Sequence, residues 1–322
     1  MEVVSPAPRD LWHSALDADP QSLADHAPAW TDAVCTERWR EASRAYVLPD
    51  GRTAVLPLVR RSTVSWYASN PPGWGYGGLV GSAARDPQVV SAVLDDLRGL
   101  GAMTLRLRPL PGDAALWPDG IRKRAHVVDL TEGPDAAFAR MRRSVRRYVR
   151  HGFDVTRGDL EAYERLWRLS VDRWATKQGE PLALGRRRAQ FRDPPSRLRA
   201  LKHHLGKDFQ VWIAWVDRQP VAGNVVVYGR SAHATRAAMD PDLAPKGVME
   251  HLDWLGMEEA CARGCPTMHL GESGTSSSLA FYKEGLGAVA HDYAEVRIER
   301  LPLTAADAAA RTTVKRLIGF KG

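Results

Sequence analysis

The residues that point most directly to chemistry are arginines near the middle of the chain. Arg143, Arg146, Arg147 and Arg150 follow one another at positions i, i+3, i+4 and i+7, and Arg142 precedes them. This spacing places the four on one face of a helix, and no Asp or Glu lies among them to offset the repulsion between like charges. We interpret the stripe as a surface for an anion such as a phosphate backbone, with a solvated helix face as the alternative.

The basic charge is concentrated in the same region. The 322 residues include 45 Lys and Arg against 38 Asp and Glu, and 19 of these basic residues but only 7 of the acidic ones lie between residues 137 and 207. The rest of the chain is therefore net acidic. A nucleic acid, the pyrophosphate of a coenzyme and an acidic carrier protein would each be attracted by such a field, so charge alone leaves the anion open.

Length and composition narrow the class of protein. A chain of 322 residues predicts two folding units, and 44% hydrophobic with 26% charged residues is typical of soluble globular proteins. No stretch approaches the roughly 18 apolar residues of a membrane span, and residues 1–10 lack the pattern of a secretion signal. We therefore expect a cytoplasmic monomer or weak dimer without membrane contact. The three cysteines suit neither a disulfide framework nor a zinc site, so we expect no metal.

The second half of the chain shows the clearer secondary-structure pattern. Apolar, β-rich runs separated by turn residues predict three antiparallel strands, at 209–217, 221–228 and 232–239. A helix at 248–263, a strand at 266–270, a short helix at 276–284 and a last strand at 288–298 are expected to follow. Ahead of the three strands we expect a strand at 153–156 and helices at 159–176 and 196–205, with Arg186, Arg187 and Arg188 in a loop.

The first half repeats this order more weakly, with strands at 42–48, 53–59 and about 64–68, a helix at 87–100, and strands at 103–107 and 126–130. Gly133 and Pro134 interrupt both patterns. The sequence therefore predicts an α/β (α+β) protein of two similar domains, each a mixed, mostly antiparallel sheet flanked by helices. Their expected limits are 1–133 and 134–302, followed by a basic helical tail at 303–322.

Several motifs resemble those of the Fem-type ligases, a family with two tandem GNAT domains. Residues 142–155 read RRSVRRYVRHGFDV, which resembles the basic helix, glycine and strand that open the second domain of that family. Residues 221–223 (VAG) and the stretches 264–273 and 281–288, the last reading FYKEGLGA, also resemble it. In the first half, Trp30 and the loop from Pro71 to Gly78 are similar to the first domain of the family.

The resemblance implies transfer of an acyl group, often an aminoacyl group from a charged tRNA, to a nucleophile such as an amine, with no bound cofactor. It implies donor binding and catalysis in the second domain, and a small-molecule or peptide acceptor on the side of the first. Lys283 matches the family lysine that lies near the reacting carbonyl, where a fixed cation stabilises the charge that gathers on oxygen. Tyr282 would hold a sugar or base ring, or else fill the core.

Further polar residues are candidates because of their places on the predicted strands. Glu272 could take a proton from the attacking amine, or could instead cap the helix that begins near Ser276. GNAT-like folds admit the donor where strand ends separate. Asn224 is polar inside an apolar strand, and the alternative for it is a purely structural amide. The substrate-binding candidates on these grounds are Asn224, Tyr228, Arg236 and Ser273.

Two loops complete the set of candidates. Trp74 and Tyr76 lie in a glycine-rich loop and could wall an acceptor pocket between the halves, or plug the core. Lys246 and Gly247 precede the main helix of the second half, whose start could hold a phosphate. The surrounding residues match the coenzyme A loop of GNAT domains poorly, which weakens the case for acetyl-CoA as donor.

Three functions are compatible with these patterns. The leading hypothesis is an aminoacyltransferase that uses a charged tRNA as its donor. A second hypothesis keeps the fold but takes the acyl group from a carrier-protein or coenzyme A thioester. A third is a non-catalytic RNA-binding protein on a degenerate GNAT scaffold.

Overall fold

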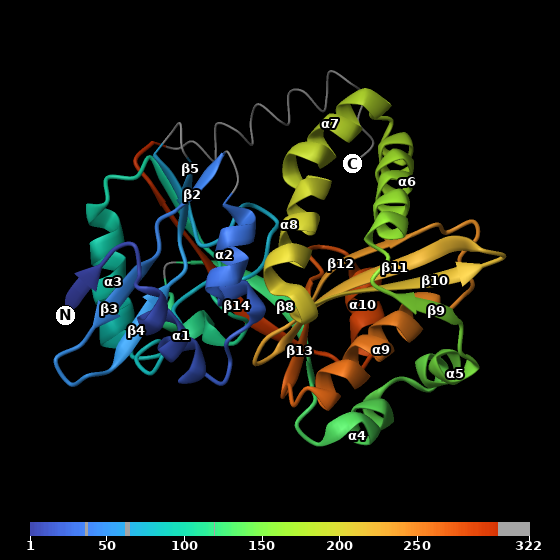
Figure 1. Cartoon of the computed structure of the whole chain (residues 1–322), viewed down its shortest axis with the longest axis horizontal. Helices are drawn as coiled ribbons and strands as arrows, with labels where there is room; N and C mark the ends of the chain where they lie inside the picture. The colour runs from blue at the N-terminus through green and yellow to red at the C-terminus, as the bar shows by residue number, and fades with distance from the viewer. Residues whose placement is uncertain (36–37, 62–64, 119, 302–322) are drawn as a thin grey trace.

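The computed structural model describes residues 1–35, 38–61, 65–118 and 120–301, so the predicted tail at 303–322 lies outside the described residues. Eleven of the described strands form one continuous sheet in the order β2-β5-β6-β7-β14-β8-β13-β12-β11-β10-β9, and β1-β3-β4 form a small sheet (Figure 1). Most neighbouring strands are antiparallel, and helices flank the sheet, which confirms the predicted fold class. Within the described residues, no helix has both the length and the apolar character needed to cross a membrane.

The first half contains short strands and three α-helices among its described residues. Its elements are β1 (Glu2–Val4), α1 (Arg9–Asp17), η1 (Ala24–His26), α2 (Pro28–Val34), β2 (Trp39–Glu41), β3 (Arg44–Val47), β4 (Thr53–Leu56), β5 (Val59–Arg61), β6 (Trp66–Ala68), α3 (Pro87–Gly99), β7 (Thr104–Leu107), η2 (Asp113–Leu116) and β8 (Ile121–Asp129).

The second half has longer elements. They are α4 (Gly133–Arg140), α5 (Arg143–His151), β9 (Asp154–Arg157), α6 (Leu160–Gln178), α7 (Leu182–Arg192), α8 (Pro195–Leu205), η3 (Gly206–Asp208), β10 (Phe209–Val216), β11 (Gln219–Tyr228), β12 (Ala232–Met239), α9 (Val248–Ala262), β13 (Thr267–Glu272), α10 (Ser277–Gly285) and β14 (Val289–Glu299). The predicted order of three strands, helix, strand, helix and strand is confirmed.

One prediction for this half was wrong. Arg186, Arg187 and Arg188 lie on α7 rather than in a loop, because this helix packs against α6 although its own sequence has little amphipathic pattern. The predicted stripe of Arg143, Arg146, Arg147 and Arg150 does lie on one helix, α5, which is separated from α4 by the buried Met141.

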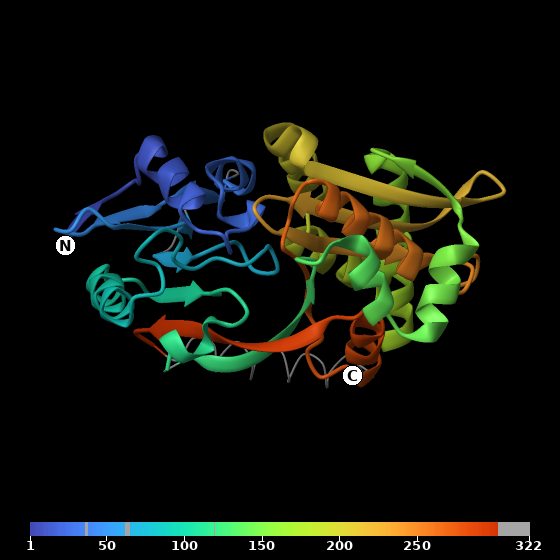
Figure 2. The ribbon, with the colours of Figure 1, turned by 90° about the horizontal axis from the view of Figure 1, so that it is seen from below.

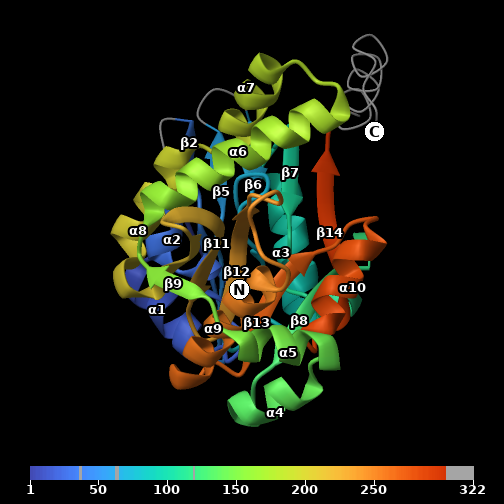
Figure 3. The same cartoon turned by 90° about the vertical axis from the view of Figure 1, so that its right-hand side faces the viewer.

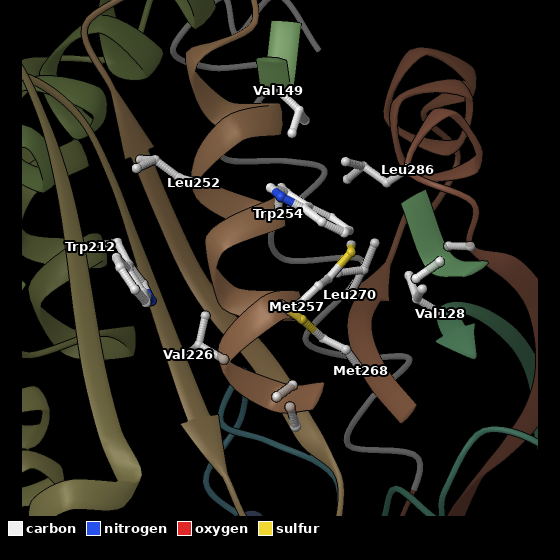
Figure 4. Packing of buried hydrophobic residues seen from close by; sticks show 14 of the residues in the cluster. Val128, Val149, Trp212, Val226, Leu252, Trp254, Met257, Met268, Leu270 and Leu286 are labelled. Atoms are coloured by element: carbon white, nitrogen blue, oxygen red, sulfur yellow. The ribbon is translucent and has the colours of Figure 1, made fainter. Parts of the chain in front are cut away.

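Helices cover both faces of the central strands, which explains why β11 is buried along most of its length. On one face α6, α8 and α2 share a core with the sheet, whereas α4, α5, α9 and α10 lie on the other (Figures 1 and 3). Figure 4 shows part of this second core, where Trp254 and Met257 of α9 approach Leu270 and Met268 of β13.

One long strand joins the two halves of the molecule. β14 lies between β8, which it pairs with through residues 289–295, and β7, which it pairs with through residues 296–299. Figure 2 shows β14 running from the side of α10 into the amino-terminal half. Because β8 also pairs with β13, strands cross the expected limit near residue 133, and the division into 1–133 and 134–302 stays a prediction.

Glu295 marks the place where β14 changes partners. Its side chain is fully buried and receives Arg106 of β7, Lys123 of β8 and Arg297 of its own strand, at 2.7, 3.1 and 2.6 Å. Burial alone would raise the pKa of this carboxyl, but the bonds and charges of these cations outweigh it and lower the pKa to about 2. The carboxylate therefore ties three strands together.

We expect Glu295→Gln to lower the free energy of unfolding by about 3 kcal/mol at pH 7, because it removes the buried charge that three partly buried cations share. Denaturant unfolding followed by circular dichroism measures this difference. A carboxyl whose pKa is lowered on folding stabilises the fold above its unfolded pKa, so the difference should shrink as pH falls from about 4.5 towards about 2. An equal difference at pH 7 and pH 4 would contradict the assignment.

Candidate active site

The sheet opens between two parallel strands of the second half. β12 and β13 pair only at Ala232 with Met268 and His233 with His269. Beyond these pairs β12 runs on to Met239 and β13 to Glu272, and neither pairs with the other along this described length. Backbone N–H and C=O groups that line such an opening are available to an extended ligand.

Lys283 of α10 reaches the open end of β13. Its side chain is buried, and its ammonium donates to the carbonyl oxygens of Gly271 at 3.0 Å and Glu272 at 2.7 Å. A lysine ammonium has three donors, so one remains for a ligand. Burial lowers the pKa of Lys283 to about 8, while the negative charges of Asp253 and Glu272 oppose that shift, and the group is therefore mostly charged at neutral pH.

Gly271 explains why two successive carbonyls meet one ammonium. In a regular strand they would point to opposite sides, but Gly271 has a positive φ of 72°, and the pairing with β8 shifts register between His269 and Gly271. α10 is started by Ser276, whose hydroxyl accepts from the Leu279 N–H, so Glu272 does not serve as its cap.

A buried polar group lies beside Lys283. The Asp253 carboxylate of α9 accepts a hydrogen bond from the Asn224 amide at 2.6 Å and another from the Tyr282 hydroxyl at 2.6 Å. Burial raises the pKa of Asp253 to about 6, although both hydrogen bonds oppose this. Asp253 was not among the predicted site residues, although its position inside the apolar run LDWLGM of a predicted helix was the available signal.

His126 and Ser273 form a second polar pair near the same lysine. The Ser273 hydroxyl lies 3.1 Å from His126 Nδ1, and His126 Nε2 is buried without a hydrogen-bond partner among the described residues, 3.9 Å from the Glu284 carboxylate. Burial and the charge of Lys283 lower the pKa of His126, which keeps the imidazole neutral. Ser273 was a predicted site residue, whereas His126, inside a predicted strand, was not.

Glu272 points to the opposite face of the sheet, away from Ser273. Its carboxylate contacts Arg108 and the Tyr293 hydroxyl, and lies 3.4 Å from Lys123. Burial would raise the pKa of Glu272, but Arg108, Tyr293 and Lys123 outweigh it and lower the pKa. A carboxylate held in this way is a weak base, so the geometry does not favour the predicted role of proton acceptor.

Three other predicted residues lie away from Lys283. Arg236 donates to the Gly73 carbonyl at 2.6 Å and to Asp193 at 2.7 Å, and its guanidinium lies over the Trp74 ring. Trp74 and Tyr76 are 1% and 2% exposed, so they plug the core and present almost no surface to an acceptor. A surface hollow of about 690 Å³ does lie on this face, between α6, α7 and the end of β12.

The last predicted positions are Tyr228 and the start of α9. Tyr228 is buried beneath the Arg263 guanidinium and is part of the core. The ring of Tyr148 packs so closely on Gly247 that an added Cβ would lie 2.3 Å from it, so this side of the α9 start is covered by α5. The Lys246 ammonium lies 5.8 Å from the centre of the Tyr148 ring. The close packing does not favour a phosphate at Gly247.

The arginines of α5 form an exposed basic surface. Arg143, Arg147 and Arg150 are exposed and Arg146 is partly exposed, while Val145 and Val149 fix the helix to the core. Within the described chain, none of these four arginines forms an ion pair with a carboxylate. Unpaired cations on a rigid helix leave the predicted anion-binding role available to all four.

Comparison with known proteins identifies the second half. Residues 136–284 match the acetyltransferase (GNAT) domain family. This part of the chain is a GNAT domain. Of solved structures, FemX is 12% identical with a TM-score of 0.63, covering 91% of this chain and 97% of FemX. L-PGS from Bacillus licheniformis is 16% identical with a TM-score of 0.51, covering 98% of each chain.

A tandem GNAT protein from the clavulanic acid biosynthesis pathway is 12% identical with a TM-score of 0.53, covering 92% of this chain and 98% of that one. No curated protein matches the chain. The match shows an acyltransferase domain of the GNAT type at residues 136–284, and the solved structures share the predicted tandem-GNAT fold, so the Fem-like resemblance is one of fold. The opening between β12 and β13 and the buried ammonium beside it lie within the matched GNAT domain.

We expect Lys283→Met to lower kcat for acyl transfer about 100- to 1000-fold, because it removes the cation that the family resemblance places beside the reacting carbonyl while preserving the length of the side chain. Single-turnover rates with a labelled donor measure the loss. Circular dichroism of the variant serves as the control for folding.

The same assignment fixes a pH dependence. Since the stabilising species is the protonated lysine, the wild-type rate should fall as pH rises through about 8, where Lys283 loses its charge. A rate that is unchanged between pH 7 and pH 10 would contradict the role of the ammonium.

Proposed function

We propose that the protein transfers an aminoacyl group from an aminoacyl-tRNA to an amine of a small-molecule or peptide acceptor. The observation that carries this proposal is the direct contact between the arginine helix and the helix that holds Lys283. The Arg142 N–H donates to the Gly285 carbonyl at 2.9 Å, and the Arg142 guanidinium stacks 3.6 Å from the centre of the Phe281 ring. A polyanion bound along α5 would therefore reach α10, the helix that carries Lys283.

Phe281 adds a surface suited to a nucleotide. The side chain is 60% exposed, although Arg142 covers one face of its ring. Exposed aromatic rings beside cations are the usual platforms for single-stranded nucleotides, since every base offers a face for stacking. A tRNA terminus could thus stack on Phe281 while its phosphates lie along Arg143, Arg147 and Arg150.

The chemistry asked of the site is modest. The amine nitrogen forms a bond to the ester carbonyl carbon, and the carbonyl oxygen becomes negatively charged beside the free donor of Lys283. The carbon–oxygen bond to the ribose then breaks. The amine loses a proton and the departing ribose oxygen gains one, so the step balances with the donor ester and the acceptor amine alone.

A thioester donor has less support. Coenzyme A would bring a pyrophosphate to the start of α9, and Tyr148 packs against Gly247 there. An acidic carrier protein would suit the charge of α5, but would leave the exposed Phe281 platform unexplained.

The test uses the purified chain, total tRNA charged with radiolabelled amino acids, and a cell extract as the source of acceptor. Transfer that is abolished by ribonuclease and by Lys283→Met would support the proposal. Transfer from a loaded carrier protein or acyl-CoA without RNA would replace it, and RNA binding without any transfer would favour a binding protein.

We expect the double variant Arg143→Gln, Arg147→Gln to raise KM for charged tRNA and to reduce the slope of log affinity against log salt by about 2, because two phosphate contacts are lost. Filter binding over a range of salt concentrations measures both effects. The matched control is Arg165→Gln, Arg168→Gln, which removes the same charge from exposed positions on α6, on the opposite face of the sheet. Equal effects from both pairs would indicate a general field rather than a binding surface.

A further inference from the structure

Asp253 is a buried carboxylate without a cationic partner. It is 6% exposed, and its hydrogen-bond donors are the amide of Asn224 and the hydroxyl of Tyr282, both neutral. Within the described chain, no Lys, Arg or His nitrogen lies within 4.0 Å of its oxygens. The Lys283 charge lowers the pKa of Asp253 only from beyond ion-pair distance, and burying a carboxylate whose direct hydrogen-bond donors are both neutral is costly, so the described site lacks a direct counter-charge.

Asn224, which donates to Asp253, has an unsatisfied hydrogen-bond acceptor of its own. It is 1% exposed, and its side-chain carbonyl oxygen is buried with no hydrogen-bond partner in the described chain. The orientation of the amide follows from chemistry, because only the NH₂ end can donate to the Asp253 carboxylate. The Asn224 side-chain oxygen can therefore accept a hydrogen bond from a ligand, and the neighbouring Asp253 carboxylate can bind a cationic group of the same ligand.

The pair lies at the opening of the sheet. Asn224 is opposite Ala237, in the part of β12 that has already separated from β13. Tyr282 reaches from α10 to Asp253 of α9, and the next residue along α10 is Lys283. A ligand in this opening would thus meet the Lys283 ammonium and the Asp253 carboxylate within one small region.

We infer that Asn224 and Asp253 bind the free α-ammonium group of the donor, so that the enzyme selects aminoacyl donors with an unblocked amino group. This inference rests on the proposed function. An ammonium group brings the missing positive charge and three donors, enough for the carboxylate and for the orphan amide oxygen. In an aminoacyl ester the α-ammonium is one carbon from the carbonyl. Lys283 would therefore bind the carbonyl oxygen while Asp253 binds the α-ammonium of the same donor.

A donor without that ammonium is disfavoured for the same reason. A plain acyl chain, or an amino group blocked by acetylation, would fill the space but leave the Asp253 charge uncompensated. Sites built around buried polar groups discriminate strongly against analogues that cannot satisfy them. The charge would therefore act as a specificity determinant rather than as a catalytic group.

The inference also predicts an acid limit for donor binding. The ionisable groups that face Asp253 are Tyr282, Glu250 and Lys283, and burial raises the pKa of Asp253 to about 6. Protonation below that pH removes the charge that attracts an ammonium. The hydrogen bond from Tyr282 lowers the pKa of Asp253, so losing it in Tyr282→Phe should move this acid limit to higher pH.

The experiment compares one tRNA preparation charged with a labelled amino acid and the same preparation after acetylation of the amino group. Wild-type kcat/KM should be at least about 100-fold higher for the free amine. Asp253→Asn should lower kcat/KM for the free-amine donor about 100-fold and leave the acetylated donor within about threefold. Glu258→Gln, at an exposed carboxylate on the same helix, is the matched control and should change neither.

Each other outcome is decisive. Equal use of both donors by the wild type, or an equal loss for both donors in Asp253→Asn, overturns the inference while the proposed function stands. If no aminoacyl-tRNA is used at all, both fall together. Should Asp253→Asn fail to fold, Tyr282→Phe keeps the carboxylate, and an acid limit that does not move for the free-amine donor overturns the inference.

Discussion

The separation of β12 from β13 is the constraint on which the rest of the site depends. Two residue pairs hold these parallel strands together at their base, and beyond His233 and His269 the sheet is open. Because the two described strands form no further backbone hydrogen bonds with each other there, side chains and the bent end of β13 line the opening. Lys283 binds two carbonyls at that end, and Asp253 links the helices that cover it.

The sheet also keeps two kinds of charge apart. On the side of α9 and α10, the ionisable groups near Lys283 are few and poorly compensated, which suits a site that a ligand completes. On the other side, Glu272 and Glu295 are each held by several cations, which suits a structural network. Neighbouring residues such as Glu272 and Ser273 therefore contribute to different parts of the structure, because their side chains point to opposite faces of the sheet.

Much of the fold could be predicted because local patterns carry it. Apolar, β-rich runs and turn residues were sufficient to predict β10, β11 and β12, and the apolar spacing of α9 was equally clear. α7 was missed because it lacks such spacing and is fixed by its packing on α6. In the site, motif resemblance led to Lys283, but Trp74 and Tyr76 were ambiguous in sequence, since a loop aromatic reads the same whether it lines a pocket or fills a core. The partners of Asp253 and His126 lie on elements far apart in the sequence, so the two polar groups could be recognised only from the structure.

The long strand β14 has a mechanical consequence. It begins four residues after the end of α10 and finishes beside β7, and its middle is fixed by the Glu295 carboxylate. Only residues 286–288 separate α10 from this shared strand. A movement of α10 would therefore act first on β14, the strand that both halves of the molecule share.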